Sequence, residues 1–310
     1  MNELILHHYP ISPFSEKVHL VLAHKKLAWK SVIVPKIMPK PDVQALTGGY
    51  RKTPFLQIGA DIYCDTALIC DVLERIQPAP TLFPAHTKGL ARVLAQWADT
   101  TLFQAAVAYS FSPKGAAQFF QGDPPDFPKA FAEDRSKMRL GAPRMASGDA
   151  AAAYKSYLRR LANMLEHQPY LLCAEPCLAD FAVYHPLWFT RVCTSAMAGI
   201  LQHTPLVTKW MDRMAAVGSS CTAELDSADA IAVAARCAPA ALHDEVFQDE
   251  HSVPLGSRVS IASESFGQEP TQGELLAATR MHYSLRRVDG RAGTLHVHFP
   301  RIGFALRALA

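Results

Sequence analysis

The sequence predicts an α/β domain at residues 1–82, an all-α helical bundle at 88–217, and a linker helix with a small β-rich domain at 218–310. Three observations support this order. Short apolar runs alternate with segments of helical periodicity up to about residue 80, long Ala-rich segments of helical period follow, and the C-terminal segment alternates apolar with polar side chains between glycine turns. A chain of 310 residues is long enough for two or three domains, each with its own core.

A β-α-β unit is expected at the start of the chain. Residues 4–9 form a short apolar run that Pro10 closes, which is typical of a buried strand. Ser12 and Pro13 fit the N-cap and the first position of a helix. Residues 29–34 form a second strand, and a proline-rich link follows it.

A hairpin and a helix complete the predicted α/β domain. Residues 53–58 and 62–64 have strand character and flank the turn Gly59-Ala60-Asp61. A helix then runs from Asp65 or Thr66 to about Ile76, because its apolar residues recur every three to four positions before Pro78.

Helical periodicity dominates the second domain. Helices are expected at 90–111, at 150–165, from Leu178 with a kink at Pro186, and at 204–216. Residues 112–148 contain five prolines, and we expect an irregular insertion with at most short helices there.

The C-terminal segment carries strand and turn signals. After a short Ala-rich helix at 228–241, strand patterns occupy 258–261, 274–287 and 294–299, with turns at Gly267, Gly273, Asp289-Gly290 and Gly293. Residues 280–310 hold six arginines and one acid, which is typical either of a solvated strand face or of a surface for an anionic partner.

Composition disfavours several classes of protein. No apolar run approaches the roughly 18 residues of a membrane span, and the first residues lack a secretion signal, so a cytoplasmic protein is expected. Seven cysteines at irregular spacings indicate reduced thiols. No metal is predicted, because the histidines have no metal-ligand spacing to nearby cysteines or acids (His7, His8, His296 and His298).

Four short motifs belong together: Ser12-Pro13-Phe14-Ser15, Thr53-Pro54, Asp65-Thr66 and residues 177–181. Over residues 1–217 they resemble the serine-type glutathione S-transferase family. Ser12-Pro13-Phe14-Ser15 is similar to the active-site turn, and Thr53-Pro54 resembles the cis-proline that opens the third strand. Asp65-Thr66 resembles the pair that holds the γ-glutamyl group of glutathione, and residues 177–181 resemble the capping box of the helical domain. The resemblance implies a thioredoxin-like domain followed by the all-α transferase domain, and residues 218–310 lie outside it.

The proposed chemistry of Ser12 follows from helix electrostatics. The unpaired N–H groups and partial positive charge at a helix N-terminus stabilise a thiolate, and a serine hydroxyl adds one donor. Ser12 would be this donor, although the same position suits a simple N-cap. Tyr9 is the alternative hydroxyl.

The resemblance also implies a ligand set. Glutathione would contact Ser12, Phe14, Lys52, Thr53, Pro54, Asp65 and Thr66. Tyr109 and Phe111 would line the pocket for the second substrate, unless they belong to the helical core, and Asp180 would be structural. Arg51 is a further candidate for a carboxylate contact or a solvated charge.

The expected function is therefore that of a glutathione transferase-like enzyme, with glutathione as co-substrate and an apolar electrophile as second substrate. Conjugation, isomerisation and reduction remain open, since each begins from an activated thiol. A homodimer without membrane or nucleic-acid partners is expected. The alternative is a non-catalytic binding or scaffold protein that uses its basic C-terminal segment for an anionic or protein partner.

Overall fold

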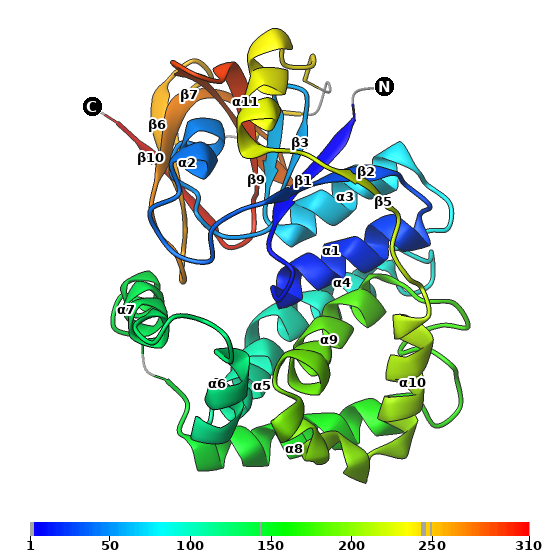
Figure 1. Cartoon of the computed structure of the whole chain (residues 1–310). Coiled ribbons are helices and arrows are strands. Elements are labelled where there is room, and N and C mark those ends of the chain that lie inside the picture. Colours follow the sequence, from blue (N-terminus) through cyan, green and yellow to red (C-terminus); the bar gives the residue numbers. More distant parts are fainter. Residues whose placement is uncertain (1–2, 143, 243–245, 249, 310) are drawn as a thin grey trace.

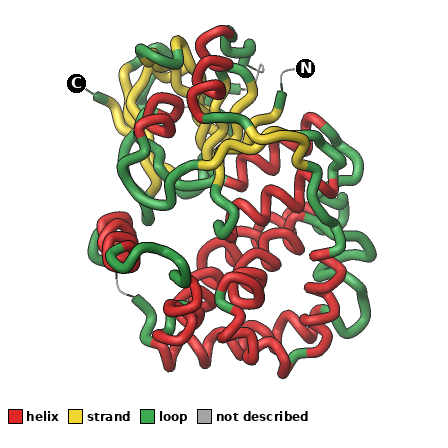
Figure 2. Tube along the Cα trace, in the orientation of Figure 1, coloured by secondary structure: helices red, strands yellow, loops and turns green. Residues whose placement is uncertain are grey.

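A computed structural model describes residues 3–142, 144–242, 246–248 and 250–309. The strands gather in one half of the molecule and most helices in the other, with α1 (Pro13–His24) and α3 (Thr66–Ile76) between them (Figure 1; Figure 2). This arrangement confirms an α/β domain followed by a helical domain with additional C-terminal strands. Among the described residues, no helix is long and apolar enough to cross a membrane.

The N-terminal domain has the predicted β-α-β and hairpin elements. β1 (Leu4–His8) pairs in parallel with β2 (Trp29–Ile33), and the antiparallel hairpin of β3 (Phe55–Ile58) and β4 (Asp61–Cys64) pairs with it on the other side. One further helix, α2 (Pro41–Thr47), lies in the proline-rich link. Pro41 occupies the first turn of α2, where a missing N–H costs nothing, so the proline starts this helix.

The helical domain follows the periodicity of its sequence. α4 (Lys88–Trp97) continues through a π-helical turn into α5 (Phe103–Ser110). α9 (Leu178–Trp188) runs through Pro186 and ends in another π-helical turn, at Phe189–Cys193. A 3₁₀ segment and two helices complete this part: Ser195–His203, α8 (Ser147–Met164) and α10 (Pro205–Ala215).

The expectation of only short helices at 112–148 was wrong. This insertion contains α6 (Pro113–Phe119) and the 13-residue α7 (Phe127–Arg139). Pro128 lies in the first turn of α7, where proline is compatible with a helix. The proline count alone therefore underestimated the helical content.

The C-terminal strands extend the N-terminal sheet on both sides. Within the described residues, ten strands form one sheet in the order β10-β6-β7-β8-β9-β4-β3-β1-β2-β5. β9 (Gly293–Pro300) pairs in parallel with β4, and β5 (Cys221–Glu224) pairs in parallel with β2. The remaining elements are α11 (Ser227–Arg236), β6 (Arg258–Ser263), β7 (Thr271–Ala278), β8 (His282–Asp289) and β10 (Phe304–Ala308).

The turn predicted at Gly273 was wrong. Gly273 lies inside β7, and a Cβ there would meet the Arg286 carbonyl oxygen at 2.6 Å, so the glycine allows β8 to approach closely. The chain reverses instead between Ala278 and His282, where Thr279 N–H donates to the His282 carbonyl.

Two apolar cores lie on opposite sides of the first strands. Leu4 and Leu6 belong to the core that α1 and α3 share with the helical domain. The second core joins Phe55 and Ile62 of the N-terminal domain with apolar residues of the C-terminal strands, such as Val297 and Phe299. The C-terminal strands thus share a buried core with the N-terminal domain.

Candidate functional site

Strand register brings three of the predicted motifs to one edge of the sheet. His7 pairs with Phe55, which also pairs with Cys64. The chain therefore leaves β1 toward Ser12, enters β3 from Thr53-Pro54 and leaves β4 toward Asp65 at the same edge. Residues distant in the sequence meet there because β3 is antiparallel to both neighbours.

Ser12 is the N-cap of α1, as the sequence predicted. Its Oγ accepts a hydrogen bond of 3.2 Å from Ser15 N–H, and the residue is only 1% exposed. A hydroxyl can donate its own proton while it accepts another. The capping contact is therefore compatible with donation from Ser12 to a thiolate.

The other two motifs have the local geometry expected of them. The Thr53–Pro54 peptide bond is cis, and Thr53 is partly exposed. Asp65 is the N-cap of α3, and its Oδ1 accepts from Ala67 N–H at 2.9 Å. Asp65 is partly exposed, which leaves its negative charge open to a cation at this edge.

A buried ion-pair network lies behind these motifs, and sequence spacing did not reveal it. Lys17 Nζ donates to Thr66 Oγ1 at 3.1 Å and to Asp99 Oδ2 at 2.6 Å, and Asp99 Oδ1 lies 2.9 Å from His185 Nε2. Burial acts to lower the pKa of Lys17, but the Asp99 carboxylate together with Cys70 and Asp65 outweighs this effect and raises the pKa above its usual value. The network connects α1 and α3 to the helical domain and keeps the Thr66 hydroxyl proton free to donate.

Lys40 is a second residue that sequence reasoning did not select. Its Nζ donates to the Arg51 carbonyl at 3.3 Å and to Thr53 Oγ1 at 3.5 Å, and the residue is only 3% exposed. Burial, followed by the nearby Arg135 and Arg51 charges, lowers its pKa to about 8. A lysine with such a perturbed pKa beside a motif residue is typical of a functional site.

Arg51 and Lys52 contact side chains from outside the N-terminal domain. Arg51 pairs with Asp134 of α7 and, at 2.9 Å, with Glu269, which precedes β7. Lys52 donates to Ser263 Oγ at 3.0 Å and lies over the Phe304 ring. Arg51 and Lys52, which the sequence indicated as candidate contacts for a ligand carboxylate, are therefore paired with groups of the insertion and of the C-terminal segment.

An aromatic cluster adjoins the loop that leads to Ser12. Arg135 of α7 lies over the Phe131 ring, and its guanidinium contacts the Tyr9 hydroxyl at 3.5 Å and the Lys36 carbonyl at 2.9 Å. Six rings contact one another here, and all but Phe189 are partly exposed: Phe111, Phe119, Phe120, Phe127, Phe131 and Phe189. The partly exposed rings form an apolar surface beside Tyr9.

Comparisons with known proteins match this geometry. Residues 6–81 match the family "Glutathione S-transferase, N-terminal domain", and residues 147–217 match "Glutathione S-transferase, C-terminal domain". A GST-like protein from Pseudomonas syringae is 40% identical over the full length of both chains, with a TM-score of 0.84. The chain belongs to the glutathione S-transferase family.

Two other relatives of this transferase-like chain are more distant. FtsZ-localized protein A of Caulobacter vibrioides is 24% identical over 187 residues, which span 58% of this chain and 74% of that protein. A glutathione S-transferase from Methylobacillus flagellatus, solved with glutathione bound, is 20% identical and has a TM-score of 0.51. It covers 68% of this chain and 94% of its own. This last likeness shows the transferase fold alone.

The capping box of the helical domain has formed despite its cysteine. Asp180 accepts from Cys177 N–H at 3.0 Å, from Leu171 N–H at 2.9 Å and from Trp210 Nε1–H at 2.9 Å. Asp180 is fully buried, and burial raises its pKa. These contacts favour the structural role that the resemblance implied.

The remaining predicted residues of the transferase-like site are divided between two places. Phe14 packs against Phe103 and His185, with ring centroids 4.7 Å and 4.6 Å away, at the contact between the domains. Phe111 belongs to the aromatic cluster, whereas Tyr109 donates its hydroxyl to the Met197 carbonyl at 3.2 Å. Phe111 therefore lies in the partly exposed aromatic cluster, while Tyr109 is engaged in the helical domain.

Proposed function

We propose that the protein is a glutathione transferase-like enzyme that activates the glutathione thiol for attack on an apolar electrophile. The observation that carries this proposal is the convergence of Ser12, Thr53-Pro54 and Asp65-Thr66 at one edge of the sheet, beside the aromatic cluster. Family membership supports a cytoplasmic homodimer as the working form.

The side chains suggest how glutathione would lie. Asp65 would pair with its α-ammonium, the Thr66 hydroxyl would donate to its α-carboxylate, and Ser12 would donate to the thiolate. Lys40, next to Thr53, would neutralise the second carboxylate. Phe14 and Pro54 would contact the tripeptide, and Lys52 would do so only by leaving Ser263.

A transferase needs a second site for its electrophile. Phe111 and the other rings of the aromatic cluster would hold an apolar molecule, and Arg135 would stand between this molecule and Tyr9. An apolar surface that binds the electrophile next to the thiolate supplies proximity, which is a large part of the rate enhancement in such reactions. Tyr109 would support this surface from behind.

The test uses Ser12→Gly, because glycine at an N-cap costs only a few tenths of a kcal/mol relative to serine. This substitution removes the hydroxyl while α1 keeps its start. Glutathione binding is measured by calorimetry, and turnover is measured with apolar electrophiles. We expect Ser12→Gly to retain glutathione binding and to lower turnover at least about tenfold, the loss of one hydrogen bond to a charged group.

Two further variants complete this test, one in the proposed binding site and one control outside it. Asp65→Asn keeps an N-cap acceptor for Ala67 but loses the charge, so it should weaken glutathione binding. Asp226→Gly changes the N-cap of α11, a helix that contributes no residue to the proposed site, and should change neither binding nor turnover. Unchanged turnover in Ser12→Gly would reject the role of Ser12.

A non-catalytic binding protein is the second candidate. Ser12 is covered, Arg51 already pairs with two carboxylates, and one relative is named for localisation with FtsZ. The basic C-terminal segment gives this candidate little support, because four of its six arginines contact groups within the chain (Arg286, Arg287, Arg291 and Arg301). Absence of glutathione binding at several millimolar would favour this candidate.

A further inference from the structure

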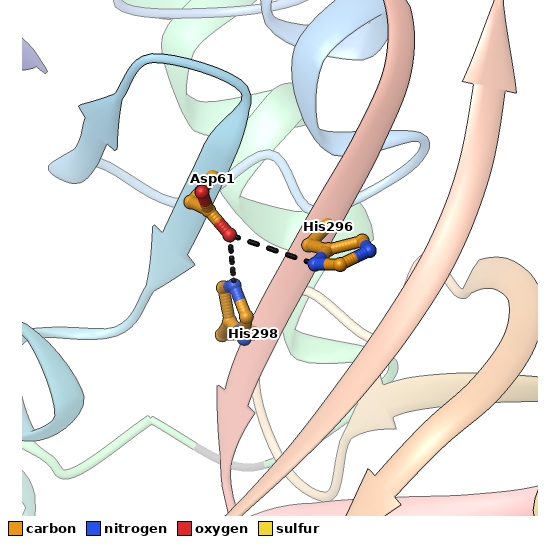
Figure 3. Close-up of side chains that lie close together, drawn as sticks. All are labelled: Asp61, His296 and His298. Atoms are coloured by element: carbon orange, nitrogen blue, oxygen red, sulfur yellow. Dashed lines mark hydrogen bonds and ion pairs between the residues drawn. The ribbon is translucent and has the colours of Figure 1, made fainter. Parts of the chain in front are cut away.

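Asp61, His296 and His298 form a cluster outside the proposed glutathione site (Figure 3). Asp61 Oδ1 lies 3.1 Å from His298 Nε2 and 3.7 Å from His296 Nδ1, and the ligand atoms of all three lie within 4.8 Å of one another. Asp61 is 5% exposed, His298 6% and His296 14% at the side chain.

The parallel pairing of β4 with β9 creates this cluster. Asp61 is in register with His296, and Tyr63 with His298. Residues two apart on a strand point to the same face, so His296 and His298 face Asp61 together. Asp61 and His298 are 237 positions apart in the sequence, which is why local spacing indicated no site here.

Surrounding groups hold two of the three side chains in place. His298 Nδ1 lies 2.8 Å from Ser284 Oγ, and the Tyr63 ring stacks on the imidazole at 4.6 Å. Asp61 Oδ2 accepts from Ala240 N–H at 2.8 Å. These outer contacts leave His298 Nε2 and Asp61 Oδ1 directed at each other, as in the outer shell of many metal sites.

His296 gives a second, independent indication of a ligand. Its Nδ1 is buried and has no hydrogen-bond partner among the described residues. A buried imidazole nitrogen without a partner loses the hydrogen bond it had in water, and a ligand in the cluster would restore one contact.

We propose that Asp61, His296 and His298 bind a divalent transition-metal ion of the zinc type, which links β4 to β9. Zinc bonds to imidazole nitrogen and carboxylate oxygen are about 2.0–2.2 Å, so tetrahedral ligand atoms lie about 3.3 Å apart. The two separations from Asp61 Oδ1 lie on either side of that value. All three ligand atoms lie within 4.8 Å of one another, so a bound ion would draw them together, and water would complete the coordination.

The same atoms also resemble a Ser-His-Asp triad, but burial argues against that use. Ser284 is fully buried, so its hydroxyl cannot meet a substrate. Ser284 contacts Nδ1 of His298, and the carboxylate faces Nε2. In a metal site, Ser284 instead orients the His298 ring and does not need contact with solvent or substrate.

The experiment compares the full chain after chelator treatment with the same sample given zinc sulfate. We expect calorimetry to show one zinc bound per chain through the cluster, and the thermal midpoint to rise by about 5 °C when free zinc exceeds its Kd a hundredfold. His296→Gln changes the least buried member of the cluster and should lose both effects. Asp61→Asn should lose them as well, while its side chain still accepts from Ala240.

Controls separate this site from other zinc ligands. His86→Gln changes an exposed histidine elsewhere, and Cys221→Ser removes an exposed thiol; both should keep the zinc response. Absence of zinc binding in the unaltered chain would overturn the proposal. Retention of the full response by His296→Gln, or its loss in Cys221→Ser, would also overturn it by placing the ion elsewhere.

Discussion

At the scale of single residues, burial keeps His7 neutral. His7 is 2% exposed, its Nε2 lies 2.8 Å from Gln57 Oε1, and its ring stacks on Phe55 with centroids 4.2 Å apart. Burial is the main cause that lowers its pKa to about 4, partly opposed by Gln57 and Asp42. An unfolded chain would titrate the same histidine near 6.5.

His7 therefore makes stability depend on pH. Between pH 6.5 and 4 the unfolded chain binds a proton at His7 that the folded chain does not, so the free energy of unfolding falls as pH falls. The expected slope is about 1.4 kcal/mol per pH unit for this residue. Urea unfolding at several pH values should give a shallower slope for His7→Gln.

The matched control for this titration is His86→Gln, which changes an exposed histidine. It should keep the slope of the unaltered protein. Equal slopes for His7→Gln and the unaltered protein would mean that His7 is protonated in the folded state or has the same pKa in both states.

At the scale of elements, the loop after α2 is shaped to receive β7. Thr271 Oγ1 donates to the Thr47 carbonyl at 2.9 Å and accepts from Tyr50 N–H at 3.2 Å. A Cβ at Gly49 would lie 2.2 Å from the Pro270 carbonyl oxygen, which is far inside van der Waals contact. The glycine is therefore needed for the close approach of the C-terminal segment.

Gly49→Ala should destabilise the protein by about 1–3 kcal/mol, the usual cost of forcing an extra methyl group into a packed contact. The atom in the way belongs to the backbone, so no side-chain rotation relieves the overlap. The midpoint of urea denaturation measures the effect. Gly89→Ala is the matched control, because a Cβ at this position in α4 meets nothing within 4 Å and alanine favours a helix. Equal midpoints for Gly49→Ala and Gly89→Ala would contradict the assigned role.

Contacts between elements also shape the candidate site. Asp134 of α7 and Glu269 before β7 both pair with Arg51, and Gly267 N–H donates to the Met138 carbonyl at the end of α7. The insertion and the C-terminal segment thus meet beside the proposed glutathione site. Both segments lie outside the two regions that match the transferase family models. The resemblance to the family therefore did not predict the contact between α7 and the C-terminal segment.

At the scale of the whole molecule, the C-terminal strands and the N-terminal domain share one core. Ile62 and Phe55 are fully buried in a cluster whose other members include Val297, Phe299 and Leu306. Removal of the C-terminal strands would expose this surface to water, at a cost of about 25 cal/mol for each Å².

A chain that ends at residue 225 is therefore expected not to fold cooperatively. Loss of the sigmoidal thermal transition in circular dichroism, together with loss of solubility, would be the measured outcome. A chain that ends at Ala308 keeps β10 and should unfold like the full chain. A folded, soluble 1–225 chain that binds glutathione would show instead that the residues after 225 are a separate module.

The sequence was sufficient where local pattern and local structure agree. Ser12, Asp65 and Asp180 were predicted at helix starts and lie there, because an N-cap depends on residues only two to three positions away. Strand alternation likewise located β6 and β9, but it merged β7 and β8 into one strand at 274–287 and did not indicate β5 or β10. Gly273 was mistaken for a turn because its close contact is with another strand. α7 was missed because the prolines of this segment were interpreted as helix breakers. A proline in the first turn, such as Pro128, is compatible with a helix.

By itself, therefore, the sequence determined the order of elements, the capped helix starts and the motifs of the transferase family. Only the tertiary structure decided which distant residues meet. Sheet order and helix docking bring together three such pairs: Lys17 with Asp99, Arg51 with Glu269, and Asp61 with His298. These contacts depend on long-range packing and register, which no local periodicity encodes.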